Sequence, residues 1–160
     1  MRYLLIDKIK KIECNKFISA VKNISMSEDV FTDHFVGYPV MPGALLIESA
    51  AQASTALLEV SSKFKIKALL TIIEKAKFRE LVRPGDQLTV NVTIISIQNE
   101  SALLEGIITM NGKTVMDCKL IFVLKPVDIF YPQKTRVLIE STYNYWLEGA
   151  ELIGFEKGES

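Results

Sequence analysis

A long apolar segment sets the architecture of this chain: residues 42–60 read PGALLIESAAQASTALLEV. Almost all of its residues are small or apolar, and its only charges are Glu48 and Glu59. Pro42 suits the first turn of a helix, because the amide hydrogen that proline lacks would have no partner there. A helix that is apolar nearly all round is buried. The segment therefore predicts a buried helix that starts at Pro42 or Gly43.

The residues after this helix are typical of antiparallel strands, which begin around Leu69–Ile73. One strand is indicated by apolar residues at every second position, Leu88, Val90, Val92 and Ile94. Turns are indicated at Gln98–Ser101 and at Asn111-Gly112, where both residues tolerate positive φ. We expect three consecutive antiparallel strands after the helix and one strand, Phe17–Ser25, before it. This order predicts an α+β fold with a sheet wrapped around a single central helix.

The chain changes character after Pro126, which closes the last expected strand. Aromatic residues are scattered among polar ones in this region: Tyr131, Tyr143, Tyr145 and Trp146. We therefore divide the chain into a domain of residues 1–125 and a C-terminal extension of residues 126–160 with no assigned role. The extension is expected to hold a short helix around Tyr143–Leu152.

The composition is that of an ordinary globular domain. The chain has 160 residues, of which 49% are hydrophobic, enough for a substantial core. Lys and Arg number 19, as do Asp and Glu, so the net charge favours neither nucleic acid nor an anionic membrane as a partner.

Three further features predict a cytoplasmic protein. Cys14 and Cys118 are too few and too far apart for a disulfide framework or a recognisable zinc site. Charged residues interrupt Met1–Ile12, so this segment lacks the apolar core of a signal peptide. No apolar run approaches the roughly 18 to 20 residues that a membrane span requires.

Two residues are candidates for acid/base chemistry. His34 is the only histidine, and a histidine side chain changes its charge most readily near neutral pH. Glu48 lies in the apolar helix, where an unpartnered carboxylate would cost several kcal/mol. Alternatively, His34 is a structural hydrogen-bonding residue of the loop. Glu48 could likewise be a capping or salt-bridge residue near the helix N-terminus, where the helix dipole favours negative charge.

Two neighbours could assist this pair. Gln52 lies one turn after Glu48 and can hydrogen-bond its carboxylate, although an ordinary buried polar residue would occupy the same position. Gly43 begins the helix, so its N–H has no intrahelical acceptor and its missing Cβ lets a ligand oxygen approach. Its alternative role is that of a simple turn residue.

At this point the sequence becomes recognisable. Residues 34–48, HFVGYPVMPGALLIE, followed by Ala51-Gln52, resemble the signature of the FabZ-type beta-hydroxyacyl-acyl carrier protein dehydratases. The resemblance continues in residues 76–79 (AKFR), 84–86 (PGD) and 4–8, and covers about residues 1–125. The chain departs from the family at Val36, where proline is usual, and at Glu80-Leu81, where Arg-Pro is usual. Apolar residues such as Leu70 replace an aromatic residue that often precedes Glu74.

The resemblance implies a hotdog fold, in which a curved antiparallel sheet wraps a long central helix. It implies a (3R)-hydroxyacyl-acyl carrier protein dehydratase that needs no metal and no cofactor beyond the phosphopantetheine arm of the carrier. It also implies a homodimer, or a trimer of dimers, in which His34 meets Glu48 of the partner subunit. Substrate-binding residues are then expected at Phe35, Pro42, Gln52 and Phe78.

The reaction removes a proton from C2 and hydroxide from C3, so it needs a base, an acid and a group that stabilises an enolate. We expect neutral His34 to take the C2 proton and the Gly43 N–H to polarise the thioester carbonyl. Glu48, kept protonated by burial, would protonate the leaving hydroxyl. In a variant, His34 shuttles both protons while Glu48 positions the water. Glutamate rather than aspartate in the helix resembles the branch of the family without isomerase activity.

Acyl carrier proteins are acidic, so the resemblance also implies a basic docking surface. Two trios of basic residues recur at every second position: Lys63, Lys65 and Lys67, then Lys75, Lys77 and Arg79. Each trio would share one face of an extended strand. We expect the carrier at Lys75, Lys77, Arg79 and Arg83. The alternative is a solvated strand face.

Two other functions fit the same fold. In a hotdog thioesterase, a helix carboxylate would activate water and the thioester would be hydrolysed. A non-catalytic acyl-carrier-binding subunit would keep the fold without the chemistry. The presence of His34, Glu48 and Gly43 together favours the dehydratase.

Overall fold

The central helix α1 spans Gly43–Ser61 in the computed structural model, which describes residues 4–155. It begins where the sequence predicts, directly after Pro42, and most of its residues beyond Ile47 are buried. Small residues let the sheet approach the helix closely. At Gly106, for example, an added Cβ would lie 2.9 Å from the sulfur of Cys118 and 3.2 Å from the Cβ of Ala50.

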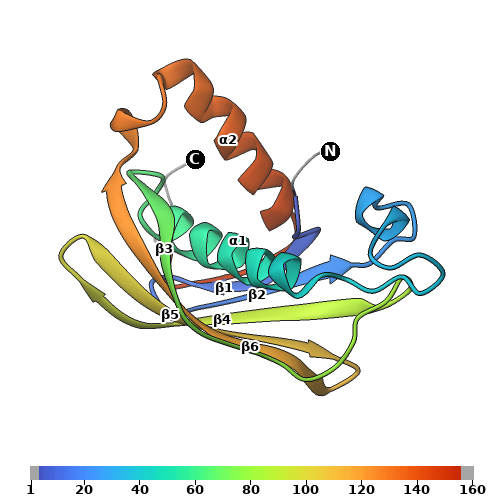
Figure 1. The fold of residues 1–160 in the computed structure, drawn as a ribbon. Coiled ribbons are helices and arrows are strands. Elements are labelled where there is room, and N and C mark those ends of the chain that lie inside the picture. Colours follow the sequence, from blue (N-terminus) through green and yellow to red (C-terminus); the bar gives the residue numbers. More distant parts are fainter. Residues whose placement is uncertain (1–3, 156–160) are drawn as a thin grey trace.

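A curved sheet wraps this helix (Figure 1). Within the described residues it has seven strands in the order β3-β6-β5-β4-β2-β1-β7. Six of them pair in antiparallel fashion, whereas β7 runs parallel to β1. The strands are β1 (Lys8–Glu13), β2 (Phe17–Asn23), β3 (Ile66–Phe78), β4 (Gln87–Gln98), β5 (Ser101–Met110), β6 (Lys113–Pro126) and β7 (Glu151–Ile153). The expected α+β layout is confirmed.

The structure corrects the expected number of strands. Four consecutive antiparallel strands, not three, follow α1 before the C-terminal segment, because β3 forms a long strand of its own at the sheet edge. Much of β3 is exposed, so it lacks the alternation that marks a half-buried strand. Strand β1 was also not predicted. A register shift between Ile9 and Lys11 breaks its period, although Ile9 and Ile12 are fully buried.

The C-terminal residues join the same structure. Helix α2 spans Gln133–Leu147, so the helix expected at Tyr143–Leu152 was placed too late. Gly149, with φ of 73°, adopts a left-handed conformation that ends a helix, and residues 151–153 form β7 instead. Residues 156–160 of the predicted extension, and residues 1–3 of the segment assessed for a signal peptide, lie outside the described residues.

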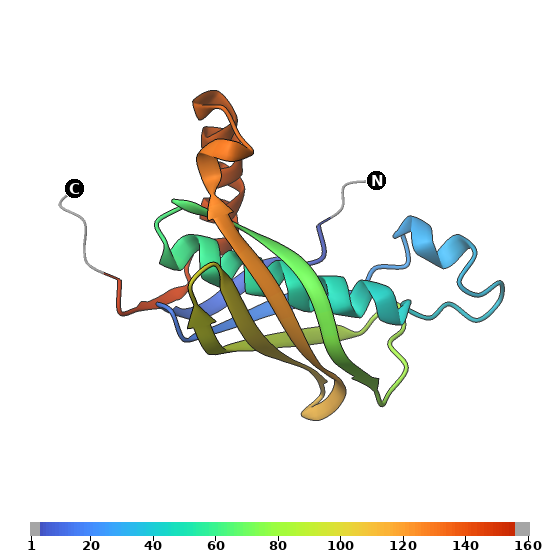
Figure 2. The same cartoon turned by 60° about the vertical axis from the view of Figure 1, so that its left-hand side comes forward.

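Figure 2 shows α2 standing over α1, on the side that the sheet leaves open. Two short 3-10 helices complete the described elements: η1 (Asp29–Thr32) before the His34 loop, and η2 (Val127–Ile129) before α2. Across residues 4–155 no helix is both long and apolar enough to pass through a lipid bilayer.

Candidate active site

A hydrogen-bonded loop between η1 and α1 holds His34. Its backbone N–H donates to Val30 O at 3.1 Å, and its carbonyl accepts from Val40 N at 2.9 Å. The ring Nδ1 lies 2.8 Å from Val40 O. Because a carbonyl oxygen can only accept, Nδ1 carries the proton of the neutral ring and Nε2 keeps its lone pair. The loop therefore presents Nε2 as a base.

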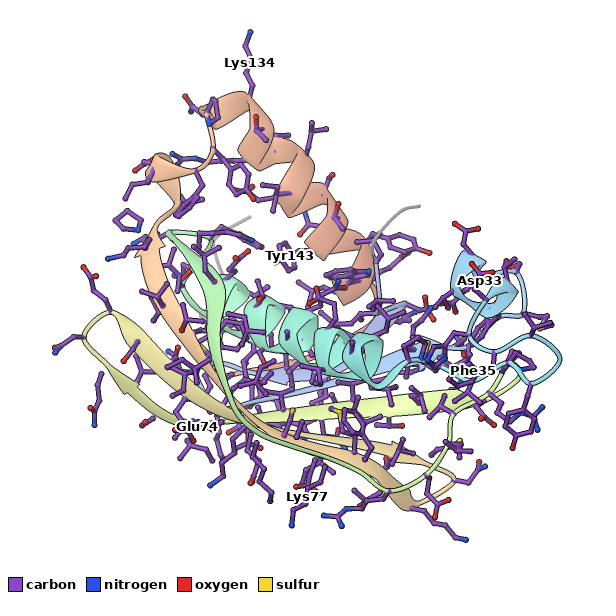
Figure 3. All side chains as sticks on the ribbon, viewed as in Figure 1. Asp33, Phe35, Glu74, Lys77, Lys134 and Tyr143 are labelled. Carbon is purple, nitrogen blue, oxygen red and sulfur yellow. The ribbon has the colours of Figure 1, made fainter. Side chains whose placement is uncertain are left out.

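The tip of this loop is apolar and exposed. Phe35 is 57% exposed, Val36 86% and Tyr38 49%. The ring of Phe35 stacks on that of His34 with centroids 4.1 Å apart. Figure 3 shows Phe35 beyond the N-terminal end of α1, away from the core. Three apolar side chains in water at one loop tip suit contact with another molecule.

Glu48 is held by a chain of hydrogen bonds. The amide Nε2 of Gln52 donates to Oε1 of Glu48 at 2.9 Å. The Oε1 of Gln52 in turn accepts from the backbone N–H of Leu5 at 2.8 Å. The N-terminal segment thus fixes which end of the Gln52 amide faces Glu48, and Gln52 orients the carboxyl group.

Gly43 lies against Phe78 at the start of α1. A Cβ added to Gly43 would lie 2.8 Å from Cε1 of Phe78, so only glycine fits without moving the ring. The Cβ side of Gly43 therefore faces Phe78, not a ligand as the sequence suggested. Pro42 precedes it with φ of −58°. As the first residue of α1, Gly43 still has an N–H without an intrahelical acceptor.

Within one chain, His34 and Glu48 have different surroundings. Glu48 and Gln52 line an open cavity of about 590 Å³. Among the described residues around this cavity, His34 is absent, and its ring contacts Val40 and Phe35 instead. The expected site residues therefore fall into two groups: the loop group with His34 and Phe35, and the helix group with Glu48 and Gln52.

The second basic trio gathers around Asp117: Lys75 and Lys77 lie on β3, and Arg79 directly follows its last residue. Lys75 Nζ lies 2.9 Å from Asp117, and Arg79 forms an ion pair with the same carboxylate. Hydrogen bonds from Lys75, and then from Arg79, lower the pKa of Asp117 despite an opposing contribution from desolvation. Lys77 is exposed, on the opposite side of the ribbon from Tyr143 (Figure 3). Arg83 lies elsewhere, with its guanidinium 4.4 Å from the centre of the Tyr38 ring.

The first basic trio does not lie on one strand. Strand β3 begins only at Ile66, and Lys63 adopts a left-handed conformation with φ of 54° in the turn before it. Lys67 forms an ion pair with Glu59 at 2.8 Å. The turn after α1 thus removes Lys63 and Lys65 from the extended pattern that their spacing suggested.

One buried network was not predicted. Glu59 is 3% exposed, and it accepts hydrogen bonds from the Tyr143 hydroxyl at 2.7 Å and from the Ala68 N–H at 3.2 Å. Burial, followed by the negative charge of Glu59, raises the pKa of Tyr143. The sequence signal was the second charge in an apolar helix, which requires a partner. In residues 4–155 no group of His, Cys, Asp and Glu side chains could hold a metal ion.

Comparison with known proteins finds a family domain and similar sequences that cover the first 125 or so residues of the chain. The family model of the FabA-like domain matches residues 1–125. The 3-hydroxyacyl-[acyl-carrier-protein] dehydratase FabZ of Halalkalibacterium halodurans is 38% identical over 124 residues, which are 77% of this chain and 89% of the relative. The FabZ of Pediococcus pentosaceus is 40% identical over 126 residues, 78% of this chain and 85% of the relative.

The solved structures agree on the fold. A hot-dog-like protein from Thermanaerovibrio acidaminovorans superposes with a TM-score of 0.62 at 17% identity, over 81% of this chain and 93% of the other. At that identity the likeness concerns the fold alone. The expected hotdog fold is confirmed.

Proposed function

This chain belongs to the FabA-like domain family, and on that premise we propose that it is a (3R)-hydroxyacyl-[acyl-carrier-protein] dehydratase. It would eliminate water from a carrier-bound thioester to give the trans-2-enoyl product. One observation carries the proposal at the level of chemistry. The bond from His34 Nδ1 to Val40 O leaves Nε2 as the base in a loop whose sequence matches the family signature.

The proton transfers follow from this geometry. His34 Nε2 takes the proton from C2, and the electron pair of that C–H bond forms the C2=C3 double bond as the C3–O bond breaks. Gln52 occupies Oε1 of Glu48, so in the protonated carboxyl group the proton sits on Oε2. Glu48 gives this proton to the leaving hydroxyl, which departs as water. The Gly43 N–H would polarise the thioester carbonyl.

We propose that each complete site combines His34 of one subunit with Glu48 of the partner subunit. The separation of the two residues within one chain supports this arrangement. Strand β3 also lies at the sheet edge and exposes Ile72 and Ile73, and such an edge is a template for pairing with another chain. The exposed tip of the His34 loop would enter the partner. A trimer of such dimers is the alternative that native mass spectrometry distinguishes.

The acyl group is proposed to arrive on an acyl carrier protein, with no metal or further cofactor, in the cytoplasm. Phe35, Pro42 and Phe78 would contact the substrate. Basic side chains would meet the acidic carrier: Lys75, Lys77, Arg79 and Arg83. Arg83 is better placed than the strand residues to act beside the His34 loop, because it packs on Tyr38. Charge reversal at Lys77 is expected to raise the KM for carrier-bound substrate in a salt-sensitive way.

Mass spectrometry of crotonyl-carrier thioester incubated with the protein tests the function directly. The expected result is a gain of water, and His34→Ala should slow it by about 100-fold or more. Asp33→Asn, which changes the exposed neighbour of His34, is the matched control and should retain turnover. Release of free carrier thiol would instead identify a thioesterase. Binding without any reaction would identify a carrier-binding subunit, and a cis-3-enoyl product would identify an isomerase.

A further inference from the structure

The cavity at Glu48 extends away from the helix N-terminus between α1, β3 and α2. From α1 it is lined by Glu48, Ala51, Gln52 and Thr55, whose spacing places them on one helix face. Apolar side chains from the sheet form another wall, among them Leu69, Leu70 and Phe122. A cavity of about 590 Å³ is within the usual size of a small-molecule site. Its lining combines the Glu48 carboxyl group and these apolar side chains with the polar side chains of Thr55, Lys67 and Tyr131.

Part of this lining comes from outside the family domain. Tyr131, Tyr143 and Trp146 belong to the residues after 125, whereas the family model ends at 125. Tyr143 and Trp146 are each 6% exposed, so their rings face inward from α2. Figure 3 shows Tyr143 between α2 and α1. This chain therefore closes its cavity with a wall that the domain of its relatives does not include.

Helix α2, which carries Tyr143 and Trp146, is held firmly against α1. The face of α1 that carries Glu48, Gln52 and Thr55 continues to Glu59, which accepts the hydrogen bond from Tyr143. Lys67 completes the charge balance of Glu59 from β3. The Tyr143 ring also contacts Phe64 at 5.3 Å and meets Trp146 edge-on at 5.5 Å between centroids. A buried charged hydrogen bond and packed rings hold α2 at a fixed distance from α1.

We propose that the cavity holds the acyl chain of the substrate and that Tyr143 and Trp146 on α2 limit the length of the chain that fits. The assignment rests on the proposed function, because it places C3 of the acyl group beside Glu48. The remaining carbons then extend toward α2 past the apolar side chains of Leu69, Leu70 and Phe122. Trp146 acts as a specificity-determining residue. Each further methylene group of the acyl chain contributes binding free energy only if the Trp146 ring leaves space for its burial.

Trp146 is the only tryptophan of the chain, so all tryptophan fluorescence comes from this residue, which lines the Glu48 cavity and also a second hollow beside Ile6 and Tyr145. The probes are saturated acyl-pantetheine thioesters that carry bromine near the thioester, at mid-chain or at the terminal carbon. They lack a 3-hydroxyl group, so quenching by bromine requires no turnover. We expect strong quenching by the terminal bromine and weak quenching by bromine near the thioester. Equal or absent quenching would overturn the proposal.

Turnover separates this inference from the proposed function. With dodecenoyl and crotonyl carrier thioesters as substrates, Trp146→Ala should raise the ratio of kcat/KM for the long chain over the short one by about tenfold. Trp146→Phe, which retains a packed ring, should give an intermediate ratio. Tyr145→Ala changes an exposed neighbour on α2 and should leave the ratio unchanged. An unaltered ratio in folded Trp146→Ala would contradict the inference even if dehydration is observed. Quenching without any dehydration would contradict only the proposed function.

Discussion

The contact between Gly43 and Phe78 ties the start of α1 to the end of β3. Phe78 is the last residue of β3 and follows Lys77, so its ring points to the helix while the Lys77 side chain points to the other face. The ring lies close enough to Gly43 that a Cβ would overlap it. One glycine thus lets a strand residue cover the helix N-terminus beside the site.

Gly43→Ala is expected to lower the free energy of unfolding by about 1 kcal/mol, because the Phe78 ring must move aside. The cost is small because the ring is half exposed and can rotate. Combined with Phe78→Ala, which removes the clash, the same change should cost almost nothing. Urea unfolding of the four proteins measures this coupling. Additive effects would show that the two residues do not interact.

At the scale of elements, α2 depends on the buried Glu59. The Glu59 carboxylate accepts hydrogen bonds from the Tyr143 hydroxyl and the Ala68 N–H, and it forms an ion pair with Lys67. These partners offset the free-energy cost of burying the carboxylate. The network joins α1 and β3, which follow one another along the chain, to α2, which is distant from both. Because β7 then pairs with β1, the segment after residue 125 is attached at two places.

Tyr143→Phe should reduce the free energy of unfolding by about 1 to 2 kcal/mol, the usual contribution of a hydrogen bond to a charged group. Burial and Glu59 raise the pKa of Tyr143 in the folded chain. The folded chain therefore keeps a proton that the unfolded chain releases above pH about 10, and stability falls as pH rises from there. The variant should lose less stability than wild type between neutral pH and pH about 11. Parallel losses in thermal unfolding would argue against the role of Tyr143.

At the scale of the whole molecule, the proposed active site draws on two places on each chain. The loop that holds His34 and Phe35 projects beyond one end of α1 (Figure 3), and Glu48 lines the cavity between α1, β3 and α2. A symmetric dimer would bring each His34 to Glu48 of the partner subunit and form two sites at once. The exposed apolar groups at the loop tip and on β3 would be covered in the same step.

Two inactive variants should therefore restore activity when combined. A heterodimer of His34→Ala and Glu48→Gln subunits contains one site with both groups intact and one site with neither. Purified by two different affinity tags, it should show about half of the wild-type turnover, as the symmetry of a dimer requires. Each variant homodimer is the control and should be inactive. An inactive heterodimer of correct mass would place both residues in the same chain.

Local patterns in the sequence were sufficient for α1, for the hairpin turn at Asn111-Gly112 and for the alternating strand β4, because each depends on neighbours along the chain. The same holds for the Gln52–Glu48 contact, which helical spacing alone dictates. The candidate residues His34, Glu48 and Gly43 were singled out by residue type and position, and the resemblance to the family signature then favoured their catalytic reading. Their catalytic roles stay predictions until the variants are assayed.

Tertiary structure decided what depends on distant segments. Glu59 and Tyr143 are 84 residues apart, so no periodicity could pair them or show that α2 closes the cavity. Strand β3 was not predicted at its full length, because much of this edge strand is exposed and so lacks the alternation of apolar and polar residues. The contact of Gly43 with Phe78 could not be predicted either, because the strand and the helix meet only in the folded chain. Sequence spacing determines what neighbouring residues can form, whereas burial and close approach are set by the packing of elements that the chain brings together from far apart.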